Sequence, residues 1–171
     1  MNLLNKYCLT IIFSVTVFSV AAQSGKYAGS LQKLIGHTYT NEKKIAGFST
    51  YQYRQGDVIS DLADANTMTL DLFVKKNAAA IIYSQLTDTV SRTYTIVDVI
   101  EVKNIPTGWE VRSADCQQGQ AEGEILIALV KTQNKAYMTI VKKAWRCNRD
   151  KLRFEAIQPK GIKCINEGFG E

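Results

Sequence analysis

The side chains best suited to binding chemistry cluster in the C-terminal part of the chain, where residues 131–163 carry ten lysines and arginines but only two acidic residues. Within this segment, two antiparallel strands are predicted to meet at a turn over residues 148–150. The hairpin gathers one aromatic and six basic candidate binding residues: Lys142, Lys143, Trp145, Arg146, Arg149, Lys151 and Arg153. Cations interleaved with an aromatic ring suit phosphate, sulfate or carboxylate groups on a polymer. The alternative is a solvated strand face whose lysines discourage edge pairing, with Trp145 in the core.

Chemistry that depends on histidine would have to use His37, the only histidine in the chain. A Ser-His-Asp triad or a zinc site needs that residue together with partners from elsewhere. His37 follows Gly36 at the predicted end of a helix, where an imidazolium stabilises exposed carbonyls and the helix dipole. The chain has no phosphate loop, dinucleotide fingerprint, nucleophile elbow or metalloprotease helix. We therefore predict no catalytic residue, metal or cofactor, and we favour binding over catalysis.

Acidic residues between Gln55 and Asn66 resemble a calcium loop in composition only. The spacing of Asp57, Asp61 and Asp64 departs from the calcium-loop signature. We interpret them as solvated acids of an irregular segment, with one helical turn starting at residue 60. Glycoside hydrolysis would require two carboxylates that face each other across a groove, and the sequence nominates no such pair.

Asp98 interrupts an otherwise apolar face of a strand predicted over residues 93–103. A buried carboxylate must be paired, hydrogen-bonded or protonated, so a ligand contact is one interpretation. The other interpretations are a strand irregularity at this point, or a core on the opposite face, which carries Val97 and Val99. We favour these two structural interpretations over a ligand contact.

Residues 1–22 have the three parts of a secretory signal peptide. A short charged segment ending at Lys6 precedes an apolar run from Leu9 to Val20, and two alanines precede a predicted cleavage site before Gln23. The apolar run is short for a membrane span, and no later stretch of about 18 apolar residues follows it. We expect an exported bacterial protein, periplasmic or secreted, without a transmembrane segment and with one domain over residues 23–171.

Three cysteines remain once Cys8 leaves with the signal peptide. In an oxidising compartment, Cys116, Cys147 and Cys164 predict one disulfide and one free thiol. Cys116 and Cys147 follow strand ends that a meander would place on the same side of a sheet, so we prefer that pair. Pairing of Cys147 with Cys164 is an almost equal alternative.

The remaining pattern is that of a β protein preceded by a short amphipathic helix over residues 25–35. The breaks between strands are short and carry turn residues, and short connections make neighbouring strands antiparallel. We predict a mainly β fold, an antiparallel meander of about eight or nine strands that forms a curved sheet or a barrel. The predicted strands cover residues 48–54, 67–74, 79–86, 93–103, 109–114, 125–131, 136–147, 152–157 and 161–165.

The favoured function is that of an exported soluble binding or accessory domain that contacts an anionic polymer or a partner protein through the basic hairpin. The alternatives are a small secreted enzyme that acts on an envelope or extracellular polymer through carboxylates, and an inhibitor or accessory subunit of another secreted protein. Specific nucleic-acid binding is not favoured. A closed apolar cavity would indicate a small-ligand carrier. Facing carboxylates in a groove would indicate an enzyme, and a flat basic face a polymer or protein binder.

Overall fold

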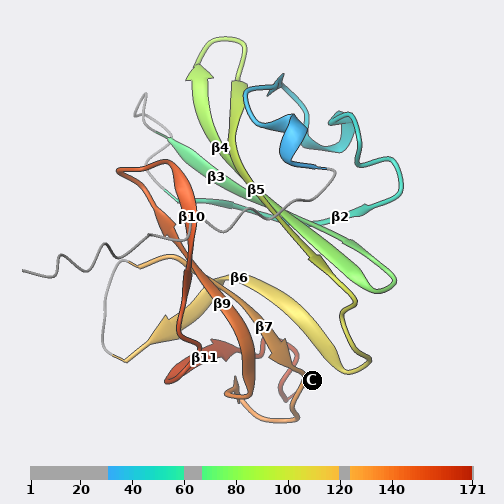
Figure 1. The fold of residues 1–171 in the computed structure, drawn as a ribbon, viewed down its shortest axis with the longest axis vertical. Helices are drawn as coiled ribbons and strands as arrows, with labels where there is room; N and C mark the ends of the chain where they lie inside the picture. The colour runs from blue at the N-terminus through green and yellow to red at the C-terminus, as the bar shows by residue number, and fades with distance from the viewer. Residues whose placement is uncertain (1–30, 60–66, 120–123, 171) are drawn as a thin grey trace, which may run out of the picture.

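The computed structural model describes residues 31–59, 67–119 and 124–170, which form two antiparallel β-sheets (Figure 1). Two single-turn 3-10 helices lie in the N-terminal part, η1 (Gln32–Leu34) and η2 (Glu42–Lys44). Sheet A contains β1 (Thr38–Tyr39), β2 (Gln52–Val58), β3 (Met68–Lys75), β4 (Ala78–Asp88) and β5 (Thr93–Lys103). Sheet B contains β6 (Trp109–Gln118), β7 (Leu126–Lys131), β8 (Tyr137–Met138), β9 (Val141–Asn148), β10 (Arg153–Ile157) and β11 (Ile162–Ile165). Residues 104–108 connect the sheets.

Sheet A has the strand order β1-β5-β4-β3-β2, so that β3 and β4 lie toward its centre and β2 forms one edge. β3 and β4 pair in unbroken register from Met68 opposite Gln85 to Lys75 opposite Ala78. Most of their residues are buried, and apolar side chains lie on both faces of each strand. β2 alternates between exposed and half-buried residues, as expected of an edge strand with one face toward solvent.

Sheet B begins as a meander of β6, β7, β9 and β10, but β11 then pairs on the far side of β6. Only residues 158–161 join β10 to β11. The Gln118 side-chain amide donates to the main-chain oxygens of Gln158 and Lys160 at 3.2 and 2.8 Å, which holds this link against β6. Sheet B therefore curls until its β10 edge comes close to β11, and in the described ranges neither sheet closes into a barrel.

Three apolar layers stabilise this arrangement. The first lies between the sheets, where Tyr83 and Ile100 of sheet A pack in one cluster with Trp145 of sheet B. The second fills the curl of sheet B around Met138. The third lies on the outer face of sheet A, which residues 31–50 cover with side chains such as Phe48. Sheet A is therefore sandwiched between the N-terminal segment and sheet B.

Three polar contacts also bridge the sheets. The Asp98 carboxylate accepts the main-chain N–H of Phe154 at 2.7 Å, and the Ser113 hydroxyl donates to Asp57 at 2.9 Å. The Arg149 guanidinium donates to the main-chain carbonyl of residue 59. Each contact joins a residue of sheet A, or the segment directly after β2, to sheet B.

The structure explains why Asp98 lies among apolar neighbours. The β4–β5 register passes from Ile96 opposite Ser84 to Asp98 opposite Tyr83, so Val97 is the extra residue of a β-bulge. The predicted strand irregularity is therefore confirmed. Burial raises the pKa of Asp98. The main-chain N–H groups of Phe154 and Val99, which donate hydrogen bonds to its carboxylate, oppose this rise. Asp98 bridges the sheets, with one carboxylate oxygen bonded to each of two N–H groups.

The predicted fold class is confirmed, and the described residues correct several details. The predicted strand over 136–147 divides into β8 and β9. β2 continues to Val58, so the segment that begins at Gln55 is not irregular as predicted. Of the predicted N-terminal helix, residues 31–35 contain only the short helix η1, and residues 25–30 lie outside the described residues.

The preferred disulfide pairing is wrong, and so is its alternative. Cys116 bonds Cys164, and Cys147 is a free, buried cysteine. Sequence reasoning placed the last strand beside β10, whereas β11 pairs with β6 and puts Cys164 directly opposite Cys116. Cys147 instead faces the layer between the sheets. Burial raises the pKa of its thiol to about 12.

Candidate ligand-binding site

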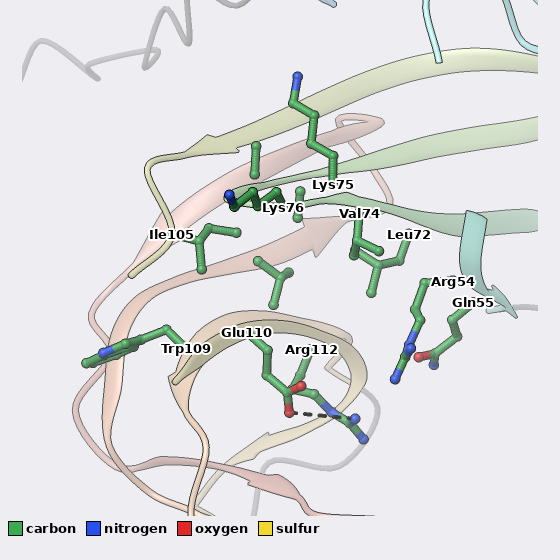
Figure 2. A pocket seen from close by; sticks show the side chains of 13 residues that line it. Arg54, Gln55, Leu72, Val74, Lys75, Lys76, Ile105, Trp109, Glu110 and Arg112 are labelled. Atoms are coloured by element: carbon green, nitrogen blue, oxygen red, sulfur yellow. Dashed lines mark ion pairs between the residues drawn. The ribbon is translucent and has the colours of Figure 1, made fainter. Parts of the chain in front are cut away.

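A pocket opens between the sheets at a place where each sheet presents an edge (Figure 2). On one side lies β2, the edge of sheet A. On the other side lies the first half of β6, which pairs only with β7 because β11 joins β6 no earlier than Cys116. The β6–β7 register skips Ala114 and Asp115 just before that point. These two residues form a β-bulge, which separates the part of β6 that pairs only with β7 from the part that also pairs with β11.

Apolar side chains form about half of the pocket lining. Leu72 and Val74 of β3 lie next to each other in the lining (Figure 2), and Val111 of β6 is a further apolar lining residue. Ile105 and Trp109 close one end, and the main-chain N–H of Ile105 donates to Asn77 at 2.8 Å, which fixes this part of the inter-sheet connection. The cavity volume is about 250 Å³. This volume lies just below the usual range for small-molecule sites, about 300 to 1,000 Å³, so the pocket suits a small ligand.

Arg54 gives the pocket an unpaired positive charge. The register of β2 against β3 shifts between Tyr53 and Gln55, which leaves Arg54 as the extra residue of a bulge. Figure 2 shows its side chain entering the space between β2 and β6, with Arg112 on the opposite side. Arg54 is exposed, and its guanidinium has no hydrogen bond or ion pair with any residue in the described ranges. It is therefore available to an anionic ligand.

Arg112 already has acidic partners. Its guanidinium lies 3.0 Å from Glu167, 3.3 Å from Asp115 and 4.0 Å from Glu110. Burial and the nearby Glu167 carboxylate raise the pKa of Asp115, while Arg112 lowers it. The Arg112 Nε is buried and lacks a hydrogen-bond partner within the described part of the chain. Arg112 thus forms a rigid polar wall, with one donor still unused.

Lysines complete the charged surroundings of the pocket. Lys75 and Lys76 line it, so its lining carries four basic residues against one acid, Glu110. The Lys75 ammonium points away in Figure 2 and lies 4.2 Å from the Tyr51 ring centroid. The ammonium of Lys142 of β9 lies 5.8 Å from the ring centroid of Trp109, at the end of the pocket that Ile105 and Trp109 close. The pocket therefore combines an apolar interior with a predominantly positive rim.

The structure places the residues of the predicted basic hairpin in different surroundings. Trp145 is 2% exposed and packs between the sheets, so it cannot be the exposed aromatic ring of a polymer-binding face. Lys142 contacts the pocket residue Trp109, and Lys143 is exposed on β9. Arg149 is directed toward the carbonyl of residue 59.

The other three predicted cations gather around a single acid. Arg146, Lys151 and Arg153 lie 3.1, 3.0 and 3.3 Å from the Glu155 carboxylate. Hydrogen bonds, first of all from Lys151, lower the pKa of Glu155 to about 2. Arg146 also pairs with Glu124 at 3.2 Å. Part of the positive charge that the sequence indicated is thus neutralised locally.

The other sequence candidates are placed as follows. Exposed His37 forms main-chain hydrogen bonds with Leu34 and Ile96. Asp57 accepts from Ser113 and Gln55. Residues 60–66 lie outside the described residues. They include the predicted helical turn and the two further acids, Asp61 and Asp64, whose spacing was compared with a calcium loop.

Sequence reasoning missed Arg54 and Arg112 as site residues. Arg54 stood at the end of a predicted strand and Arg112 within another, and neither position carried a motif. The β-bulge that frees Arg54 and the partial coverage of β6 depend on strand pairing. The one usable signal was Trp109 directly after Gly108 at the start of a strand, an aromatic residue next to a turn.

The comparisons with known proteins add no assignment. No helix in the described ranges is long and apolar enough to cross a membrane. A scan against protein-family models and searches of curated proteins and solved structures found no match to this chain.

Proposed function

We propose that this protein is an exported binding domain that holds a small amphipathic anion in the pocket between its sheets. The observation that carries the proposal is a pocket that combines apolar side chains with the unpaired guanidinium of Arg54. The apolar body of a ligand would pack between Leu72, Val74 and Val111, and its anionic group would lie toward Arg54. Ligand pockets of this type commonly combine hydrophobic walls with a few polar groups that fix the orientation.

The compartment is part of the proposal. The N-terminal sequence has the pattern of a signal peptide, and one disulfide is typical of proteins that fold in an oxidising environment. A bacterial periplasm or the outside of the cell fits both features. In that compartment, short-chain carboxylates and related amphipathic anions are the class of ligand that this pocket would capture.

An enzyme of the carboxylate type receives less support. Glycoside hydrolysis needs two carboxylates across the scissile bond. Glu110 is the one acid among the pocket-lining residues, and it faces Arg112 at 4.0 Å. A polymer-binding hairpin is also less well supported, because Trp145 is buried and Glu155 pairs with three of the cations.

Binding of octanoate, followed by tryptophan fluorescence to which the pocket residue Trp109 contributes, tests the proposal. Octanoate should bind more tightly than octanol and octylammonium, because only the carboxylate pairs with Arg54. Hexanoate should bind about 15-fold more weakly than octanoate, because two CH₂ groups contribute about 1.6 kcal/mol when buried. Equal binding of all three head groups would contradict the proposal, and so would the lack of any dependence on chain length.

Two variants locate the binding site. Arg54→Gln should weaken octanoate binding up to about five-fold and leave octanol binding unchanged, because an exposed ion pair contributes at most about 1 kcal/mol. Val74→Phe should weaken binding of both compounds by filling the pocket. Arg92→Gln is the matched control, because Arg92 is exposed in the β4–β5 turn, at the opposite end of β4 from the pocket residue Ala78. An equal effect of the two arginine variants would place the anion elsewhere.

A further inference from the structure

A second pocket, of about 160 Å³, lies on the outer face of sheet A, away from the inter-sheet site. Three tyrosines line it: Tyr39 of β1, Tyr53 of β2 and Tyr94 of β5. Tyr39 and Tyr94 stack with ring centroids 5.5 Å apart. The charged residues of its lining are all acidic, namely Glu42, Asp57 and Asp71. Its lining thus has the opposite charge to that of the inter-sheet pocket.

Asp71 lies at the base of this pocket as a buried carboxylate without a cationic partner. It is 6% exposed, and it accepts hydrogen bonds from the hydroxyls of Tyr39 at 2.7 Å and Tyr53 at 3.5 Å. No lysine or arginine forms an ion pair with it among the described residues. Burial, with a smaller contribution from Glu42, raises its pKa to about 6. A buried carboxylate of this kind is stabilised by a cation that lies close to it.

Thr69 provides an independent indication of a ligand. It lines the pocket two residues before Asp71 on β3, so both side chains lie on the same face. Thr69 is 8% exposed, and its hydroxyl makes no hydrogen bond of ordinary geometry within the described ranges. The Tyr39 hydroxyl donates to the neighbouring Ser84 at 3.0 Å, and its weaker interaction with Thr69 also opposes the rise in the Tyr39 pKa that burial causes. A buried hydroxyl without a well-formed hydrogen bond is costly, and Thr69 lines the pocket in which a ligand donor could satisfy it.

Gly56 keeps the pocket in this shape. A Cβ at this position would collide with the Tyr53 hydroxyl and lie 3.0 Å from an Asp71 carboxylate oxygen. Gly56 lies directly opposite Asp71 in the β2–β3 pairing. The missing side chain therefore allows the Tyr53 hydroxyl to approach Asp71 over the β2 backbone.

We propose that this pocket binds a primary ammonium group of a small organic amine. The ammonium would donate to the Asp71 carboxylate and the Thr69 hydroxyl, while the tyrosine rings face its positive charge. One cation is already present nearby, since the Lys43 ammonium lies 5.8 Å from the Tyr53 ring centroid. Lys43 is exposed and does not line the pocket, so it competes with a ligand through its charge.

The test uses n-butylammonium as the probe and follows the tyrosine ring signals by NMR in the intact protein at pH 7.5. Butylammonium should give saturable shifts at Tyr39, Tyr53 and Tyr94 and bind more tightly than tetramethylammonium, which has no N–H donor. n-Butanol, which has no charge, should bind more weakly than both. Equal binding of tetramethylammonium would overturn the assignment of a primary ammonium, and equal binding of butanol would overturn that of a cation.

Variants separate ligand contacts from effects on folding. Asp71→Asn should weaken butylammonium binding at least ten-fold, and Thr69→Val at least three-fold. Lys43→Gln should strengthen binding. Asp150→Asn, an exposed acid in the β9–β10 turn, is the charge-matched control and should have no effect.

Thr69→Val is nearly isosteric and removes an unsatisfied hydroxyl, so it should fold at least as well as the parent protein. It keeps the proposal testable even where Asp71→Asn is unstable. Unchanged affinity in folded Thr69→Val would overturn the proposed donor arrangement. Octanoate binding at the inter-sheet pocket should be unchanged in all of these variants.

Discussion

Reduction of the Cys116–Cys164 disulfide should lower the free energy of unfolding by about 4 kcal/mol. The bond closes a loop with a sequence separation of 48 residues. For a loop of this length, chain-entropy reasoning gives an unfolded-state entropy loss of about 14 cal/mol/K, or about 4 kcal/mol at 25 °C. Both cysteines are buried in the curl of sheet B, so the reduced sulfurs should keep most of their packing in the native state. The loss should therefore come mainly from the unfolded chain.

Urea denaturation of the oxidised and the reduced protein, followed by circular dichroism, measures this difference. The midpoint should fall on reduction, and the double variant Cys116→Ala, Cys164→Ala should behave like the reduced protein. Cys147→Ala is the control and should retain the full effect of reduction, because Cys147 is the free cysteine. Peptide mapping without reduction should show the Cys116–Cys164 pair. A stability loss below about 1 kcal/mol, or any mapped pair that contains Cys147, would refute this reasoning.

Three further predictions concern charge and processing. Because burial raises the pKa of Asp71 from 3.8 to about 6, the native state retains a proton that the unfolded state releases. Asp71 should therefore contribute a fall of about 2 to 3 kcal/mol in the free energy of unfolding between pH 4 and pH 7, and in urea titrations Asp71→Asn should lose less stability than the parent protein by this amount. Glu155→Gln should increase retention on an anionic matrix by releasing three cations, and it would fail to do so if the basic hairpin contributes nothing to anion binding. Mass spectrometry of the exported protein should show an N-terminus at or near Gln23, and soluble protein that retains residues 1–22 would contradict the predicted signal peptide.

β3, β4 and β5 of sheet A and the first strands of sheet B could be predicted from local patterns, whereas β1 was not predicted and β2 begins and ends four residues later than predicted. β5 has the same bounds as its prediction, because its alternation is strong and turns flank both ends. The path of β11 could not be predicted, since a four-residue connection normally indicates a hairpin. Here it crosses the opening of a curled sheet, and that curl follows from the packing inside sheet B. The cysteine pairing depended on the same curl.

The candidate site was less predictable than the fold. The basic segment was visible as charge, but the face on which each cation lies depends on strand register. For this reason the sequence did not show that Trp145 is buried, or that Glu155 pairs with three of the basic residues of the hairpin. Arg54 and Asp71 become significant only through what lies around them, a bulge in one case and three tyrosines in the other. Neither environment is a property of nearby sequence.

The described chain passes from one sheet to the other only once, at residues 104–108, so each sheet is built from one continuous stretch of sequence. A cut in this connection would therefore yield two complementary fragments, each with all the strands of its own sheet. The disulfide would remain whole within the C-terminal fragment. The apolar layer between the sheets would provide the surface for reassociation. Ile105, in the connection, and Trp109, the first residue after it, line the inter-sheet pocket. Reassembly of the two fragments would therefore also restore that binding site.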